Sequence, residues 1–442
     1  MQTASKKVIN GWAMYDWANS VYNLVITTTF FPVYYTEMTK GAPFNGQVSI
    51  LGRYYVNTAL YNYALAFTYL VVAISLPILS SIADYKGNKK RFMQVFCLIG
   101  SAACSGLYFF TPENFDWGII CMMIAAFGFY GSQVFYNSYL PEIAAEKDRD
   151  RVSAKGFTYG YIGSVLMQMV GFVLVVFWNK IPFLNSAGDA VRLTFLLVGI
   201  WWFGFAQITF KRLPKSVGSE KINGSKNFLS GGFIELRKVF NQSLKMPVLK
   251  RYLFSFFFYS MGVQTVMLAA TNFGSKVLNL DSTKLILTVV IIQLVAIAGA
   301  YLMAKLSEMF GNFQVLIGVV IFWIGICFGG YYMQTEYHFY MLAVGVGLVM
   351  GGIQALSRST YSKLMPPTKD TASFFSFYDV TEKIAIVIGL TAFAYIEELT
   401  GSMRNSVLSL MVFFTIGLIG LISALQRQKK EKQVAMKEIT II

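Results

Sequence analysis

Long apolar segments separated by short polar loops dominate the sequence. A helix needs about 20 apolar residues to cross a bilayer, and segments of that length recur twelve times. They form two sets of six, at about 11–36, 56–82, 92–110, 117–140, 156–178 and 193–210, and then 251–274, 285–304, 313–333, 339–361, 374–396 and 406–425. The pattern predicts an all-α integral membrane protein with twelve transmembrane helices in two six-helix pseudo-repeats.

One long polar segment, residues 211–250, separates the two sets and is rich in Lys, Ser and Gly. We therefore expect an N-terminal six-helix bundle over residues 1–210, a central loop, and a C-terminal bundle with a basic tail over residues 251–442. Four apolar residues of the loop recur at helical spacing among basic residues: Phe233, Leu236, Phe240 and Leu244. The spacing is typical of a basic amphipathic helix on the membrane surface, and an ordinary solvated linker helix is the alternative.

The composition agrees with a membrane protein and argues against an enzyme. The chain is 55% hydrophobic and only 13% charged, which leaves no room for a sizeable soluble domain. Its four cysteines lie in apolar runs at irregular spacing and it has one histidine, so we expect no disulfide framework, metal site or histidine-based triad. No Walker A motif is present. We expect a protein without catalytic residues, cofactor or metal.

The charge balance, 37 Lys and Arg against 22 Asp and Glu, raises the question of a nucleic-acid partner. When the N-terminus is placed in the cytoplasm and the sides alternate across twelve spans, 29 of the 37 basic residues fall on the cytoplasmic face. Seven fall on the opposite face, and Lys383 lies within a span. This asymmetry predicts that both termini are cytoplasmic, and it indicates contact with membrane lipids rather than nucleic acid.

The two halves carry matching motifs at a common offset. Asp84, Gly87 and Asn88 follow the second span, and Glu308, Gly311 and Asn312 follow the eighth. Such a repeat is typical of transporters. Gly permits the positive φ of a tight turn, and a carboxylate at this junction can accept hydrogen bonds from a neighbouring helix N-terminus. We therefore expect a gating contact at these junctions, with five residues in it: Asp84, Gly87, Arg91, Glu308 and Gly311.

Polar residues inside the spans are the candidates for function, because a charge at bilayer depth costs several kcal/mol unless it is paired or faces water. They form stripes at helical spacing on the first, fourth, tenth and eleventh spans. The predicted substrate or coupling residues are Asp16, Asn19, Asn23, Gln133, Asn137, Gln354, Arg358, Asp379, Glu382 and Lys383. The alternatives are a structural lock for Asp16, an intrahelical salt bridge between Asp379 and Lys383, and interhelical hydrogen bonding for the amides.

Three strings resemble a known family. The run from Asp84 to Arg91, Asp-Tyr-Lys-Gly-Asn-Lys-Lys-Arg, resembles the loop between helices two and three of the major facilitator superfamily. Trp12-Ala-Met-Tyr-Asp-Trp-Ala-Asn-Ser20 and Gly351-Gly-Ile-Gln-Ala-Leu-Ser-Arg-Ser359 are similar to signatures of the branch that includes the fungal autophagy-related vacuolar amino-acid effluxers. The resemblance implies a twelve-helix carrier that works by alternating access, and in the fungal members it implies export of amino acids from the vacuole.

The sequence therefore predicts a secondary active transporter with one central site, moving a small polar solute such as an amino acid. A proton is the expected coupling ion, because a carboxylate that loses water in a closed state binds H⁺ more readily, and Asp16 and Glu382 are the candidates. The alternatives are a sugar or drug carrier of the same fold, an ion channel and a non-transporting membrane receptor. We expect a monomer in the inner (cell) membrane of a bacterium.

Overall fold

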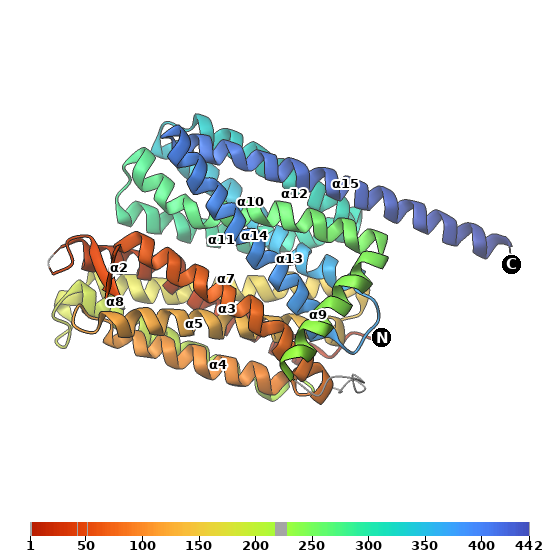
Figure 1. Cartoon of the computed structure of the whole chain (residues 1–442), viewed down its shortest axis with the longest axis horizontal. Helices are drawn as coiled ribbons and strands as arrows, with labels where there is room; N and C mark the ends of the chain where they lie inside the picture. The colour runs from red at the N-terminus through yellow and green to blue at the C-terminus, as the bar shows by residue number, and fades with distance from the viewer. Residues whose placement is uncertain (1, 42, 51, 217–227, 442) are drawn as a thin grey trace. The chain divides into compact units, whose positions relative to one another are not determined.

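The computed structural model describes residues 2–41, 43–50, 52–216 and 228–441, and most of these are helical (Figure 1). Ten of the described helices are long and apolar enough to cross a membrane. The prediction of a helical, multi-pass membrane protein is confirmed. The chain forms two compact units: unit 1 holds Met1–Thr3, Leu140–Thr158 and Ser225–Ile442, and unit 2 holds Ala4–Tyr139 and Tyr159–Gly224.

Unit 2 begins with an unbroken helical run. It comprises α1 (Lys6–Val21), a π-helical stretch η1 (Tyr22–Phe30) and α2 (Phe31–Lys40). The remaining helices are α3 (Asn57–Lys86), α4 (Lys89–Gly106), the 3₁₀ turn η2 (Leu107–Phe109), α5 (Phe115–Ser138), α7 (Arg149–Val176) from Tyr159 onward, the 3₁₀ turn η4 (Trp178–Lys180) and α8 (Ala187–Arg212). π-Helical turns are rare and frequently occur at functional sites, which makes the middle of this run notable.

A short hairpin between α2 and α3 is an element that the hydrophobic pattern did not predict. Strand β1 (Gln47–Ile50) pairs antiparallel with β2 (Arg53–Val56), with Val48 opposite Tyr55. The strands are too short to give a clear alternation in the sequence.

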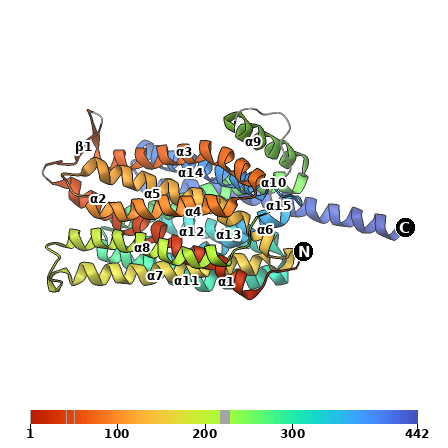
Figure 2. The ribbon, with the colours of Figure 1, turned by 90° about the horizontal axis from the view of Figure 1, so that it is seen from below.

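Glycines allow the helices of unit 2 to approach closely. Figure 2 shows α4 and α5 side by side, and a Cβ atom on Gly128 would lie 2.5 Å from the Cα atom of Gly100. A Cβ atom on Gly163 of α7 would lie 2.7 Å from the carbonyl oxygen of Trp17 in α1. Small residues at such crossings are the usual means by which helices pack within a membrane.

Unit 1 consists of the C-terminal helices together with a segment from the first half of the chain. The segment contains α6 (Leu140–Ile143), the 3₁₀ turn η3 (Glu146–Asp148) and the first residues of α7. The other helices are α9 (Phe228–Lys245), α10 (Pro247–Leu278), α11 (Ser282–Phe310), α12 (Asn312–Tyr332), α13 (Glu336–Leu364), α14 (Thr371–Thr400) and α15 (Met403–Ile441). Helix α15 packs against both α10 and α12 (Figure 1).

Candidate functional site

A cluster of three charges lies within α14, at a point where most of the surrounding residues are apolar. Lys383 Nζ lies 3.1 Å from Asp379 Oδ1 and 3.2 Å from Glu382 Oε2. Asp379 and Lys383 are buried, at 6% and 3% exposed. The intrahelical salt bridge expected from the i, i+4 spacing is therefore present, and Glu382 joins it.

The α14 cluster is extended by α10 and is incompletely paired. Gln264 of α10 donates a hydrogen bond of 3.1 Å from Nε2 to Glu382 Oε1. The second carboxylate oxygen of Asp379 has no hydrogen-bond partner among the described residues. With both carboxylates ionised, two negative charges face one positive charge, so the cluster carries a net charge of −1. A buried excess charge is costly, which makes the α14 cluster a place where a further cation is favoured.

A hydroxyl cluster joins α10 to α13 in the same unit. The hydroxyl of Tyr252 donates to the backbone oxygen of Ser357 over 2.7 Å, and the hydroxyls of Tyr259 and Ser357 lie 2.7 Å apart. Tyr378 of α14 stacks on Phe256, with ring centroids 4.2 Å apart. Tyr252 and Tyr259 were not among the predicted site residues, because a tyrosine in a membrane helix is usually an interfacial or packing residue.

The guanidinium group of Arg358 on α13 contacts residues at the start of α7. Its Nε donates to Ser153 Oγ over 2.9 Å, and Nη2 donates to the backbone oxygen of Ser153 over 2.8 Å. The guanidinium also lies 4.3 Å from the ring centroid of Phe157. A cation over an aromatic ring gains about 1 kcal/mol or more when desolvated, and Arg358 is 3% exposed. These contacts hold the beginning of α7 against α13.

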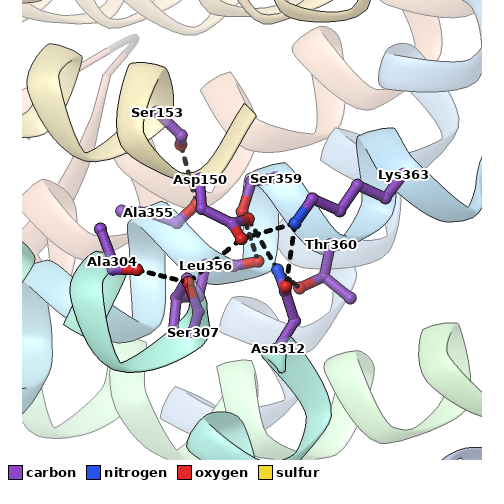
Figure 3. A network of polar contacts seen from close by, with 10 residues as sticks. All are labelled: Asp150, Ser153, Ala304, Ser307, Asn312, Ala355, Leu356, Ser359, Thr360 and Lys363. Atoms are coloured by element: carbon purple, nitrogen blue, oxygen red, sulfur yellow. Dashed lines mark hydrogen bonds and ion pairs between the residues drawn. The ribbon is translucent and has the colours of Figure 1, made fainter. Parts of the chain in front are cut away.

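A second network around Asp150 fastens the same segment (Figure 3). Lys363 of α13 approaches Asp150 Oδ2 to 2.5 Å, and Asn312 at the start of α12 donates to Oδ1 over 2.7 Å. Ser307 of α11 donates to Oδ2 over 3.1 Å. Asp150 is only 2% exposed. One carboxylate from the first half of the chain therefore meets three helices of the second half.

The Asp150 network was not predicted from the sequence. Asp150 and Lys363 are 213 residues apart, and both lie in polar segments where charged residues are usually solvated. The only signal was Asn312, which belongs to the repeated junction motif. In the structure Asn312 also accepts a hydrogen bond of 3.0 Å from Lys363.

The two repeated junctions both place a glycine at positive φ, but they differ in the rest of the turn and in their charges. Gly87 has φ +62° and Gly311 has φ +90°, so both glycines adopt the backbone geometry that the turn argument expects. At the first junction Asp84 forms a buried ion pair of 3.0 Å with Lys89. At the second junction Glu308 is exposed. Arg91, the remaining gating candidate, is also exposed.

The polar stripe of α1 is held by α5 within unit 2. The hydroxyl of Tyr136 donates to Asp16 Oδ2 over 2.7 Å, and the indole of Trp12 donates to the backbone oxygen of Tyr136 over 3.0 Å. The Trp12 and Tyr136 rings stack at 4.4 Å. Asn19, one turn beyond Asp16, is fully buried, and both polar atoms of its amide are without a hydrogen-bond partner in the described part of the chain. An unsatisfied buried amide is costly, which indicates a ligand or water that completes it.

The other predicted amides are less enclosed. Asn23, Gln133, Asn137 and Gln354 are all half-buried. In unit 2, Asn23 lies on η1, which continues α1, and Gln133 and Asn137 lie on α5, so all three are on the elements that carry Asp16 and Tyr136. In unit 1, Gln354 lies one turn before Arg358 on α13. Five of the ten predicted substrate or coupling residues therefore lie in each unit.

Comparison with known proteins places the chain in a family. A sequence profile described as "Vacuole effluxer Atg22 like" matches residues 4–435. The MFS-type transporter YxiO of Bacillus subtilis (strain 168) is 33% identical over 411 residues, which cover 93% of each chain. The chain belongs to the Atg22-like family. Autophagy-related protein 22-2 of Aspergillus niger is a more distant relative of this Atg22-like chain, 24% identical over 86% of it and 78% of the fungal protein.

Solved structures assign the fold of the Atg22-like chain. FucP, a major facilitator superfamily transporter in the outward conformation, has a TM-score of 0.70 at 12% identity and covers 95% of this chain and 98% of its own. The proton:xylose symporter XylE gives the same TM-score and covers 95% of both chains. The expected resemblance to the superfamily is thus confirmed, and with it a membrane transporter that is not an enzyme.

Proposed function

We propose that this Atg22-like protein is a secondary active transporter that moves a small zwitterionic solute, with amino acids as the substrate class. The observation that carries the proposal is the α14 cluster, in which two carboxylates share one buried ammonium group and one oxygen of Asp379 has no hydrogen-bond partner among the described residues. The carboxylates attract an ammonium group, and Lys383 attracts a carboxylate. A sugar offers neither charge, and a lipophilic drug does not use both. The Atg22-like family, whose name describes a vacuole effluxer, supports export as the direction of transport.

Proton coupling follows from the same cluster. A proton and a substrate ammonium group each neutralise the excess negative charge, so they compete for the carboxylates of Asp379 and Glu382. Competition between a proton and the substrate for one site gives exchange, in which proton entry drives substrate export. Asp16 in unit 2 is the second carboxylate proposed to take part, with Asn19 as a substrate contact.

Alternating access requires a contact that forms in one state and opens in another. We assign this role to the attachment of residues 140–158 to α13, made by the Asp150 network and by Arg358. The Asp84–Lys89 pair and the turns at Gly87 and Gly311 are proposed to support the same movement. Ion pairs suit this purpose because they are directional and their charges become solvated when the contact opens.

The proposed topology has twelve spans. The helical run of α1, η1 and α2 and the charged helix α14 add two spans to the ten that length and apolarity identify. The excess of basic residues then places both termini in the cytoplasm. The bundles are proposed to comprise residues 1–210 and 251–442 around the central loop 211–250, in a monomer of the bacterial cell membrane.

Substrate analogues test the proposal. In proteoliposomes loaded with an amino acid, uptake of the labelled amino acid by counterflow should be inhibited by the same compound. Analogues that lack either the amino or the carboxyl group should inhibit at least tenfold less well, since each loses one charged contact. Lys383→Met should weaken inhibition by the intact amino acid and leave the weak inhibition by the decarboxylated analogue unchanged. Equal inhibition by all three compounds would refute recognition of a zwitterion.

A further inference from the structure

Helix α9 carries a basic face that the transport mechanism does not use. Six residues at helical spacing line an open hollow of about 440 Å³: Ile234, Arg237, Lys238, Asn241, Gln242 and Lys245. Three of them are cationic and two are amides. No acidic side chain of the described residues lines this hollow. The hollow therefore has the donors to hold an anion with several oxygen atoms.

The position of α9 fixes where that anion lies. The helix ends at Lys245, and the membrane span of α10 begins at Pro247, so its C-terminal end is at the level of the membrane surface. Val239 and Ser243 are buried on the side that packs against α10 and α14. Phe240 and Leu244 lie at the edge of this packed side and are 45% and 41% exposed. The side chains of Phe233 and Leu236, which the sequence also placed on the apolar side, lie outside the described residues.

We infer that the basic face of α9 binds the headgroup of an anionic phospholipid. The cations and amides take the phosphate oxygens, and the exposed side chains of Phe240 and Leu244 contact the acyl chains beside it. A helix with a basic face and an adjoining apolar side is suited to the boundary between headgroups and chains. A soluble phosphate would satisfy the basic face and leave the apolar side in water, so the lipid is the better match.

The bound headgroup also affects a transport helix. Lys238 Nζ lies 3.6 Å from Asp370 Oδ2, and Asp370 is the residue that precedes α14. Phe240 contacts Phe377 with ring centroids 5.9 Å apart, two residues before Asp379. A phosphate in the hollow competes with Asp370 for Lys238. Lipid binding is thereby linked to the start of α14, the helix that carries the charged cluster. The lipid site itself is separate from the proposed substrate site.

Native mass spectrometry of the full-length protein tests this inference without any transport measurement. Purified protein is offered an equal mixture of phosphatidylglycerol and phosphatidylcholine, and wild type should retain phosphatidylglycerol preferentially. Arg237→Gln with Lys245→Gln should weaken retention of phosphatidylglycerol roughly 30-fold, since each cation near a charged lipid surface contributes to binding. The matched control is Lys429→Gln with Lys430→Gln, which removes two exposed lysines of α15 and should leave retention unchanged.

Two outcomes overturn the inference. One is undiminished phosphatidylglycerol retention in the α9 variant, with its melting temperature equal to that of wild type. The other is displacement of phosphatidylglycerol by inorganic phosphate at equal concentration, which would make the hollow a site for a soluble anion. Phe240→Ser with Leu244→Ser separates the contribution of the apolar side chains from that of the cations. This variant should lose phosphatidylglycerol affinity while keeping all three cations.

Discussion

Neutralising Asp150 should open the contact between the start of α7 and α13. In the structure this carboxylate is 2% exposed and accepts hydrogen bonds from Lys363, Asn312 and Ser307. Asp150→Asn keeps the shape of the side chain and one accepting oxygen but removes the charge. The variant therefore isolates the electrostatic part of the contact.

The free energy lost in Asp150→Asn follows from the burial of the ion pair and from the hydrogen bond that Lys363 retains. Breaking a buried ion pair by removing one partner typically costs about 3–5 kcal/mol. Here the Lys363 side chain is 19% exposed and keeps its hydrogen bond to Asn312, so part of its charge remains stabilised. We take about 2 kcal/mol, which corresponds to a shift of roughly 30-fold toward the open state.

Cysteine labelling measures that shift. Ser359→Cys places a thiol on α13 at a fully buried position, one turn before Lys363, where maleimide reacts only when the contact opens. All four native cysteines are buried, and Cys327 serves as an internal reporter of unfolding. Adding Asp150→Asn should raise the labelling rate of the Ser359→Cys protein by up to about 30-fold, with Cys327 still protected, because labelling then follows the population of the open state.

The matched control is Arg151→Gln, the neighbouring charge, whose side chain is 66% exposed in a pair with Asp148. It should leave labelling unchanged, since exposed pairs contribute about 0–1 kcal/mol. An unaltered labelling rate in Asp150→Asn, or an equal increase in the control, would refute the assignment of this contact as a gate.

Two further predictions concern stability, measured as melting temperature in detergent. Gly299→Ala should lower the melting temperature, because a Cβ atom would overlap the backbone of α13. A Cβ atom at Gly318 meets nothing within 4 Å, so Gly318→Ala should leave the melting temperature unchanged or slightly raised. Equal melting temperatures for the two variants would contradict the close helix contact at Gly299. Lys89→Gln should lower the stability by about 3 kcal/mol, because it removes the cation that pairs with the buried carboxylate of Asp84. Glu308→Gln, at the repeated but exposed position, should change the stability by less than about 0.5 kcal/mol. Similar losses in both variants would show that the two junctions are equivalent.

The architecture was largely predictable from the sequence because a bilayer imposes a simple rule on helix length and apolarity. Each of the twelve predicted spans overlaps a described helix or helical run, ten of the described helices are long and apolar enough to cross a membrane, and the central loop contains α9. The π-helical stretch η1 was not predictable, since its residues have no composition that distinguishes them from an α-helix. The β1–β2 hairpin escaped because it is too short to show a pattern.

The site was predictable only where its residues share a helix. Asp379, Glu382 and Lys383 are neighbours in sequence, so their pairing followed from helical spacing. Asp150 and Lys363 are brought together by tertiary packing, which no spacing reveals. The repeated junction motif was informative about backbone, through Gly87 and Gly311, but not about charge. Burial, and not the motif, decides which acidic residue is paired.

Accumulation of an amino acid in proteoliposomes under an imposed pH gradient tests the central claim most directly. The liposomes carry wild type or the variant Asp379→Asn with Glu382→Gln, and labelled substrate is followed with and without the gradient. For wild type we predict saturable accumulation of the amino acid on the side of the membrane from which protons leave. In the variant, which lacks the excess negative charge, the pH gradient should no longer drive accumulation. Accumulation by the variant that responds to the gradient as wild type does, or saturable flux of a sugar with none for any amino acid, would contradict the account.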